Sequence, residues 1–235
     1  MKLSGIQPFT LLDFPDRTAC IAFLPGCNFR CGYCHNPEFV LPDMIQKIRD
    51  SFVDEETFFS FLEKRKGKLD GVVVSGGEPT IWQELPMFLN KIKERGFLVK
   101  LDTNGNNPAM LRSLLELGLV DYVAMDLKTD PERYPEVAGA CARPENIRES
   151  ISLLMHANIP SEFRCTLIQE LHPKETLEAM AAAIRGSERV YLQIFRAGHT
   201  LDPAFSQYHA FSQSELEEIR MNIFEGSVKH TSIRS

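Results

Sequence analysis

Three cysteines within eight residues are the feature of this sequence best suited to chemistry. Cys27, Cys31 and Cys34 directly follow a short apolar run. Three thiolates can fill three corners of a 4Fe–4S cube, whose usual ligand set is four. No further cysteine lies nearby in the downstream sequence, so one iron would keep an open position, which marks a reactive metal rather than a structural one. We therefore predict a redox-active iron–sulfur cluster on these three residues.

Two other interpretations of the same cysteines remain open at this stage. One is a structural zinc site with His35 as the fourth ligand, and the other is an electron-carrier cluster completed by a distant cysteine. Zinc sites usually show a second ligand pair at a set distance, and the other histidines offer none. The remaining thiols, Cys20, Cys141 and Cys165, are interpreted as core or incidental residues.

Polar residues follow three further apolar runs that read as strands. The run Gly71–Ser75 ends in Gly76-Gly77-Glu78-Pro79, the next ends in Asp102-Thr103-Asn104-Gly105, and a third ends in Asp126-Leu127-Lys128. Paired glycines let a backbone come close to a ligand, and a carboxylate such as Glu78 can accept a charge-assisted bond from an ammonium group. Asn-Gly is also a common turn, and an Asp–Lys pair can be a mere surface ion pair.

The elements that would position these residues alternate between strand and helix patterns. Helix-spaced apolar residues separate the β-rich runs, which predicts parallel strands joined by right-handed crossovers. The β-rich runs are Thr18–Leu24, Gly71–Ser75, Phe97–Asp102, Tyr122–Asp126, Glu162–Ile168 and Val190–Phe195. About 30 residues per unit is the spacing of TIM barrels, but the chain is too short for eight units. We predict an α/β fold: an open partial TIM-type barrel of six βα units, plus a C-terminal helix.

Several boundary signals refine this prediction. Asp54 could cap a helix over Glu55–Lys64, and Ser212 with Glu215 predicts a capping box for a last helix through about Phe224. The segment before Thr18 is expected to form an extra strand or a hairpin. We expect one domain over residues 1–235, with the βα core at about 18–195 and a C-terminal extension at about 196–235.

Composition limits the classes of partner. The formal net charge is −6, which argues against nucleic acid as a ligand, and 43 % hydrophobic residues allow a sizeable core. The N-terminus has no apolar stretch typical of a signal peptide, and no run approaches the length of a membrane span. We expect a cytoplasmic protein that binds neither nucleic acid nor membrane.

The motifs together resemble a known family. The segment CNFRCGYCHN resembles the CxxxCxxC loop of the radical S-adenosylmethionine (SAM) superfamily, and GGEP resembles the motif that holds the methionine amino group there. DTNG and DLK resemble strand ends of its glycyl-radical-activating branch, which includes pyruvate formate-lyase activating enzyme. The resemblance implies that the open iron is chelated by the amino and carboxylate groups of SAM, and that reduction of SAM yields methionine and a 5′-deoxyadenosyl radical.

The resemblance also implies a set of cofactor contacts, with no side chain needed as a general acid or base. Arg164 matches an arginine that points toward the cofactor. Arg196 stands where the branch often has a histidine near the ribose, and His199 comes three residues later. A monovalent cation is implied near Asp102 and Asp126. The implied cofactor-binding residues are Tyr33, His35, Gly76, Gly77, Glu78, Asp102, Thr103, Asn104, Asp126, Lys128, Arg164 and Arg196.

The N-terminal segment from Gly5 to Val40 is similar to that of anaerobic ribonucleoside-triphosphate reductase activating proteins. This similarity implies a glycyl-radical enzyme, namely that reductase, as partner, and a low-potential electron donor such as flavodoxin or ferredoxin. The alternatives are an activator of a pyruvate formate-lyase type enzyme and a small-molecule radical enzyme such as 7-carboxy-7-deazaguanine synthase. A zinc or electron-carrier module is the alternative outside the enzymes.

Overall fold

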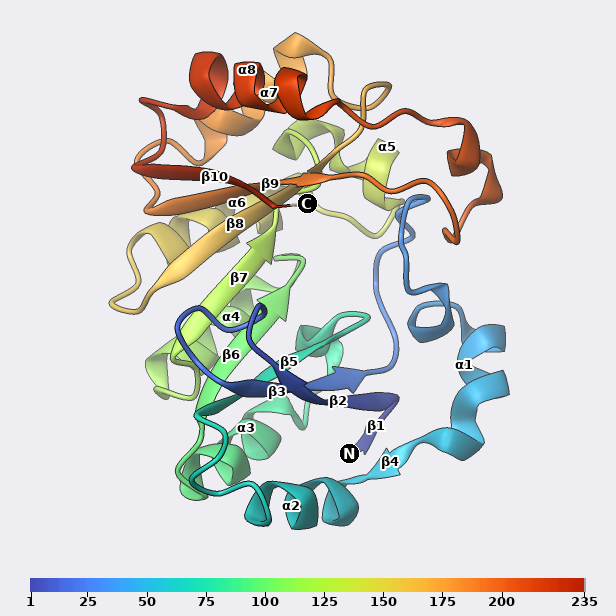
Figure 1. The fold of residues 1–235 in the computed structure, drawn as a ribbon, viewed down its shortest axis with the longest axis vertical. Coiled ribbons are helices and arrows are strands. Elements are labelled where there is room, and N and C mark those ends of the chain that lie inside the picture. The colour runs from blue at the N-terminus through green and yellow to red at the C-terminus, as the bar shows by residue number, and fades with distance from the viewer. Residues whose placement is uncertain (235) are drawn as a thin grey trace. The chain divides into compact units, whose positions relative to one another are not determined.

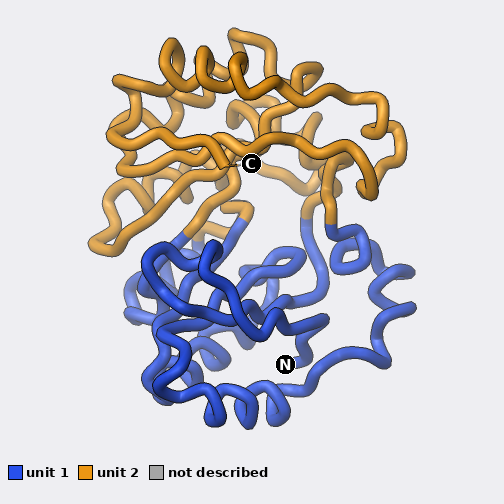
Figure 2. The backbone as a smooth tube through the Cα atoms, viewed as in Figure 1, with its two compact units in different colours: residues 1–28, 36–103, 109–123 blue, residues 29–35, 104–108, 124–235 orange. Residues whose placement is uncertain are grey.

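The computed structural model describes residues 1–234, and the chain divides into two compact units (Figure 2). Unit 1 comprises Met1–Asn28, Asn36–Thr103 and Ala109–Val123, drawn in blue, and unit 2 comprises Phe29–His35, Asn104–Pro108 and Ala124–Ser235, drawn in orange. Strands and helices alternate along the chain through both units (Figure 1). The prediction of a single domain remains a prediction.

Unit 1 contains strands in the order β6-β5-β3-β2. The pairs β3–β5 and β5–β6 are parallel, and β2 pairs antiparallel with β3, so the segment before Thr18 forms the predicted hairpin. A separate antiparallel pair joins β1 to β4. The strands are β1 (Lys2–Leu3), β2 (Gly5–Thr10), β3 (Ala19–Leu24), β4 (Val53–Asp54), β5 (Gly71–Gly76) and β6 (Leu98–Thr103), and the helices are α1 (Pro42–Ile48), α2 (Glu55–Glu63), α3 (Leu85–Glu94) and α4 (Pro108–Glu116).

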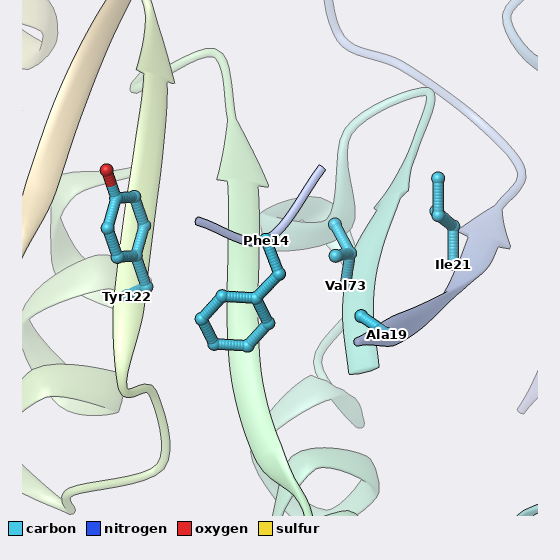
Figure 3. Close-up of a cluster of buried hydrophobic side chains, with 5 residues drawn as sticks. All are labelled: Phe14, Ala19, Ile21, Val73 and Tyr122. Carbon is cyan, nitrogen blue, oxygen red and sulfur yellow. The ribbon is translucent and has the colours of Figure 1, made fainter. Parts of the chain in front are cut away.

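The hairpin segment supplies an aromatic side chain to the core of unit 1. Phe14 packs with Ala19, Ile21, Val73 and Tyr122 in one buried cluster (Figure 3). A Cβ on Gly71 would come within 2.8 Å of the Phe14 ring, so a residue without a side chain is needed where the ring crosses β5. The segment before β3 is therefore part of the core of this unit rather than an appendage.

Unit 2 contains β10, β9 and β8 in that order, and β8 is followed by β7, whose residues are shared between the units. The pairs β8–β9 and β9–β10 are parallel. The strands are β7 (Tyr122–Asp126), β8 (Ser161–Leu167), β9 (Arg189–Ile194) and β10 (His230–Arg234), and the helices are α5 (Tyr134–Ala138), α6 (Pro144–Met155), α7 (Lys174–Ala183) and α8 (Gln213–Ile219), with a π-helical turn at Arg220–Phe224.

The predicted α/β class with mostly parallel strands is confirmed. Asp54 caps α2 by accepting a hydrogen bond from the Thr57 amide at 2.7 Å, and Ser212 and Glu215 form the predicted capping box of α8. The chain after α8 was predicted without a strand, yet His230–Arg234 adds β10 beside β9. Among residues 1–234 no helix is long and apolar enough to cross a membrane.

Candidate functional site

In unit 1, the end of β5 pairs with the backbone that leads into the cysteine loop. The Gly77 amide donates to the Leu24 carbonyl at 2.9 Å, and the Glu78 amide donates to the Gly26 carbonyl at 2.8 Å. A Cβ on Gly76, whose φ is +123°, would lie 2.2 Å from the Leu24 oxygen, and a Cβ on Gly77 would lie 2.1 Å from the Gly26 oxygen. Both glycines are therefore required for this close backbone approach just before Cys27.

Glu78 is buried and joins two strand ends of unit 1. One oxygen of its carboxylate accepts hydrogen bonds from the Thr80 amide at 3.1 Å, the Thr80 hydroxyl at 2.5 Å and the Thr103 hydroxyl at 2.7 Å. Because Thr103 ends β6, the carboxylate links the GGEP turn to the next strand end. This organising role was not predicted from the sequence.

Asp102 has a protein cation as its partner. The Lys100 ammonium, whose side chain is 1 % exposed, donates to Asp102 at 2.5 Å. Lys100 and Asp102 stand two residues apart on β6, so their side chains leave the same face of the strand. Lys100 was not among the predicted site residues, although a lysine inside an apolar strand two residues before a carboxylate is a usable signal.

In unit 2, Cys31 and Cys34 are set by a turn in which the Cys34 amide donates to the Cys31 carbonyl at 3.0 Å. Cys31 is buried, and burial raises its thiol pKa to about 11 in spite of the nearby Lys128 cation. A thiol of this kind ionises when a metal coordinates it. Cys27 belongs to unit 1. Among residues 1–234, neither unit contains a group of three His, Cys, Asp or Glu side chains close enough to hold a metal ion.

A segment after β9, residues 199–208, is hydrogen-bonded to the cysteine loop of unit 2; we refer to it as the strap. The Leu201 amide donates to the Cys34 carbonyl at 2.9 Å, and the Asp202 amide donates to the Gly32 carbonyl at 2.9 Å. A Cβ on Gly32 would lie 2.1 Å from the Phe205 ring, so this ring packs directly on the loop. No signal in the sequence pointed to the strap.

The two aromatic residues predicted near the cofactor also contact this region of unit 2. Tyr33 is buried 6.0 Å from the Phe205 ring centroid, and within the described residues its hydroxyl oxygen has no hydrogen-bond partner. His35 is exposed, and its Nδ1 lies 3.2 Å from the carbonyl oxygen of His199. The unpartnered Tyr33 hydroxyl beside two thiols leaves a polar group for a bound ligand or water to satisfy.

Asp126, Lys128 and Arg164 form an ion network in unit 2. Lys128 donates to one Asp126 oxygen at 2.9 Å, and the Arg164 Nε donates to the other at 2.8 Å. Burial raises the pKa of the Asp126 carboxyl, but the two cations outweigh it and hold that pKa well below its usual range. Burial lowers the pKa of Lys128, and Asp126 with the Cys31 thiol outweighs it, so the ammonium persists. The ammonium lies 6.0 Å from the centroid of the Tyr33 ring.

The remaining predicted residues are placed less distinctively. Asn104 is buried and its side-chain oxygen accepts the Asn106 amide at 3.0 Å, while Arg196 is exposed in the loop after β9. The implied monovalent cation stays a prediction. It would compete with Lys100 for Asp102, and with Lys128 and Arg164 for Asp126. Cys20 and Cys165 are buried as expected of core thiols, and Cys141 is exposed.

Comparison with known proteins decides the family. A profile of the radical SAM superfamily matches residues 21–185, which is more than half of the chain. The chain belongs to the radical SAM superfamily. Radical SAM proteins use a 4Fe–4S cluster and SAM, and the three-cysteine loop is consistent with both.

Three relatives illustrate its place among radical SAM proteins. A Methanocaldococcus jannaschii protein, named as a candidate glycyl-radical enzyme activating enzyme, is 30 % identical over 92 % of this chain and 89 % of its own length. Pyruvate formate-lyase-activating enzyme of Streptococcus mutans is 32 % identical over 60 % of each chain. The 7-carboxy-7-deazaguanine synthase of Methanopyrus kandleri is 25 % identical over 83 % of this chain and 74 % of its own length.

Solved structures agree on the fold. A domain of pyruvate-formate lyase-activating enzyme from Bacteroides vulgatus matches with a TM-score of 0.56 at 18 % identity, over 70 % of this chain and 99 % of that one. Streptococcus suis SuiB bound to its precursor peptide SuiA matches with a TM-score of 0.65 at 14 % identity, over 90 % of this chain and 47 % of that one. These radical SAM folds confirm the partial-barrel class.

Proposed function

We propose that this protein activates a glycyl-radical enzyme. With its cluster reduced by an external donor, SAM would be cleaved to methionine and a 5′-deoxyadenosyl radical, which takes a hydrogen atom from a backbone glycine of the partner and leaves a glycyl radical there. The observation that carries the proposal is the cysteine loop itself, which follows β3 and whose approach is hydrogen-bonded to the GGEP strand end. Relatives named as activating enzymes support it.

The residues present fit the cluster by the chemistry of their donors. Cys27, Cys31 and Cys34 would hold it, because three thiolates within one short loop match the ligands that iron–sulfur clusters use. Cys31 and Cys34 are held in a defined turn by the strap. Burial raises the pKa of the Cys31 thiol to about 11, a rise that the Lys128 ammonium only partly offsets, so coordination by iron would be what ionises this thiol. The zinc alternative would take His35 as its fourth ligand; Nδ1 of this residue lies beside the carbonyl of His199, which leaves Nε2 as the nitrogen that could bind a metal, so metal analysis decides between zinc and the cluster.

Binding of SAM would use residues of both strand-end groups. Gly76, Gly77 and Glu78 would receive the methionine amino group, and Asp126, Lys128 and Arg164 would supply fixed charges. No step of the proposed reaction requires these side chains to transfer a proton. Their role would be to bind and orient SAM and to exclude water from the site. The other proposed contacts are Tyr33, His35, Asp102, Thr103, Asn104 and Arg196.

The finer proposal concerns the partner, an anaerobic ribonucleoside-triphosphate reductase. It is supported by the resemblance of residues 5–40 to the activating proteins of that reductase and by the absence from the sequence of additional ferredoxin-type cysteine sets. A flavodoxin or a ferredoxin would serve as the low-potential donor. The similarity to 7-carboxy-7-deazaguanine synthase favours one other candidate, a small-molecule radical enzyme.

Electron paramagnetic resonance separates these candidates. Reduced protein, SAM and the reductase are mixed without oxygen, with a reductase whose radical glycine is replaced by alanine as the matched control. We expect a doublet glycyl signal from the wild-type reductase and none from the control. A signal only with a pyruvate formate-lyase type partner would refute the finer proposal, and turnover of a free deazaguanine precursor without any protein substrate would refute activation altogether.

A further inference from the structure

Lys128 lies two residues after Asp126, the last residue of β7, where the neighbouring strand no longer supplies partners to the backbone. The Leu127 amide still donates to the Arg164 carbonyl at 2.8 Å, but the Lys128 amide donates instead to the Tyr134 hydroxyl at 3.0 Å. That hydroxyl in turn donates to the Asp126 carbonyl at 3.3 Å. The hydroxyl of Tyr134, a side chain that is 0 % exposed, therefore takes the place of the next backbone hydrogen bond of the sheet.

His172 completes the same arrangement from the other side. Its Nε2 lies 2.9 Å from the Lys128 carbonyl oxygen, and its Nδ1 lies 2.9 Å from the Ile168 amide nitrogen. The Lys128 carbonyl can only accept, so Nε2 of the neutral ring carries the proton, and Nδ1 accepts from the Ile168 amide although the Ile168 carbonyl oxygen lies 3.1 Å away. The ring is 1 % exposed and bridges the loops that follow β7 and β8.

These contacts leave Lys128 with both backbone polar groups bonded to buried side chains. Its ammonium is part of the ion network with Asp126 and Arg164, so the direction of the side chain depends on how the backbone is held. Neither Tyr134 nor His172 is in the set of proposed cofactor contacts. Tyr134 also meets the Phe29 ring edge-on, with centroids 6.0 Å apart, on the segment that leads to Cys31.

We infer that Tyr134 and His172 are positioning residues that clamp the backbone of Lys128 and thereby fix its ammonium for binding of SAM. The inference rests on the proposed function for the role of Lys128, while the clamp itself is a property of the protein without cofactor. Tyr134 bonds to the amide of Lys128 and His172 to its carbonyl. Loss of either bond should therefore weaken SAM binding only when the Lys128 ammonium is present.

A double-mutant cycle with SAM affinity as the readout tests this inference. Tyr134→Phe removes both bonds of the hydroxyl and keeps the ring, and we expect it to weaken SAM binding about two- to tenfold, the effect of one net hydrogen bond. In a Lys128→Met background the same change should have no further effect. Effects that simply multiply would overturn the inference, because they would show that Tyr134 acts independently of Lys128.

Variants of His172 supply the conservative rescue. His172→Gln can still accept from Ile168 and donate to Lys128, so it should retain near wild-type affinity, whereas His172→Leu should weaken binding as Tyr134→Phe does. Ile184→Val, a fully buried position at the end of α7, controls for a general loss of packing and should leave SAM affinity unchanged. Equal losses in the Gln and Leu variants would contradict the clamp.

Hydrogen exchange in the protein without cluster or SAM separates the clamp from the proposed function. The Lys128 amide should exchange on the order of tenfold faster in Tyr134→Phe, because its acceptor is gone, and unchanged exchange would overturn the inference. Wild-type protein that carries a cluster yet binds no SAM would refute the proposed function instead, and the exchange rate of the Lys128 amide would then decide the clamp by itself.

Discussion

At the end of β7, the Asp126 carboxylate accepts bonds from both Lys128 and Arg164. Because these cations depress its pKa, the carboxylate stays ionised throughout the neutral range, and its contribution to stability is full above the ordinary carboxyl pKa and is lost as the pH falls from there to the depressed value. A carboxylate placed in this way holds two cationic side chains at fixed positions. Asp126 therefore contributes a negative charge to the site and also fixes the positions of the two positive charges.

Replacing that carboxylate should affect SAM more than the cluster. Asp126→Asn removes one charge but keeps a polar side chain, and we expect SAM affinity to fall by roughly ten- to a hundredfold, the effect of a lost charge-assisted bond, with iron content near normal. Equilibrium binding and iron analysis on the same reconstituted sample measure both quantities. Unchanged affinity would mean that the Asp126 network is only structural.

The cysteines give the sharpest contrast between residues. Cys31→Ala should abolish SAM cleavage and reduce the bound iron from about four atoms per chain, since three thiolates are the whole protein ligand set. Cys141→Ala is the matched control, because this thiol is exposed and lies outside the loop, and it should retain activity. Active Cys31→Ala protein, or zinc without iron and sulfide in the wild type, would rule out the cluster assignment.

At the scale of elements, the strap and the cysteine loop form one packed piece of unit 2. Gly32 has room for Phe205 only because it lacks a Cβ, and two strap amides bond to carbonyls of the loop. We expect Gly32→Ala to displace the strap, which would speed hydrogen exchange at Leu201 and Asp202 and increase the rate at which iron is lost. The measurement is amide exchange combined with iron release to a chelator.

The companion variant makes this prediction specific. Gly32→Ala combined with Phe205→Ala removes the overlap and should restore slow iron loss relative to Gly32→Ala alone. If the two changes instead add their defects, Phe205 does not act through Gly32. Gly5→Ala is a control for glycine replacement in general, because its φ is not positive and a Cβ there would meet only the Phe23 ring, at an ordinary 3.8 Å.

Some of the helices and strands could be predicted from the sequence, and others could not. The strand β7 (Tyr122–Asp126) was predicted to the residue, and the other five predicted strands to within one residue at each end, because an apolar run that ends abruptly in polar residues defines its own boundary. The strand β10, His230–Arg234, was missed because its burial is only partial and its residues carry no alternating apolar pattern. Its pairing partner, β9, precedes α8 and is therefore far from β10 in the sequence.

The candidate site was predictable to a similar extent. Cys31, Glu78 and Asp126 could be chosen from the sequence because their spacing and position after strands are local signals. Tyr134 and His172 could not, because no pattern in the sequence marks a tyrosine six residues after Lys128, or a histidine 44 residues after it, as a partner of its backbone. Contacts of this kind follow from tertiary packing, which spacing does not encode.

At the scale of the whole molecule, the protein is a radical SAM superfamily member for which we propose glycyl-radical activation. Superfamily membership rests on residues 21–185, and the α/β class with mostly parallel strands agrees with it. Transfer of a hydrogen atom from a partner's glycine is the central claim, and it depends on a macromolecular partner that is not part of this chain. A test of that claim has to follow the hydrogen atom from the partner's glycine to the 5′-deoxyadenosine formed by this protein, which links the two molecules directly.

Isotope transfer provides that link most directly. The anaerobic reductase is prepared with glycine deuterated at its α-carbon, mixed without oxygen with the reduced protein and SAM, and the 5′-deoxyadenosine produced is analysed by mass spectrometry. We expect 5′-deoxyadenosine that carries one deuterium, formed together with the glycyl radical signal, and unlabelled product when only the radical glycine is replaced by alanine. Unlabelled 5′-deoxyadenosine from the intact deuterated reductase would show that the protein does not take hydrogen from that glycine.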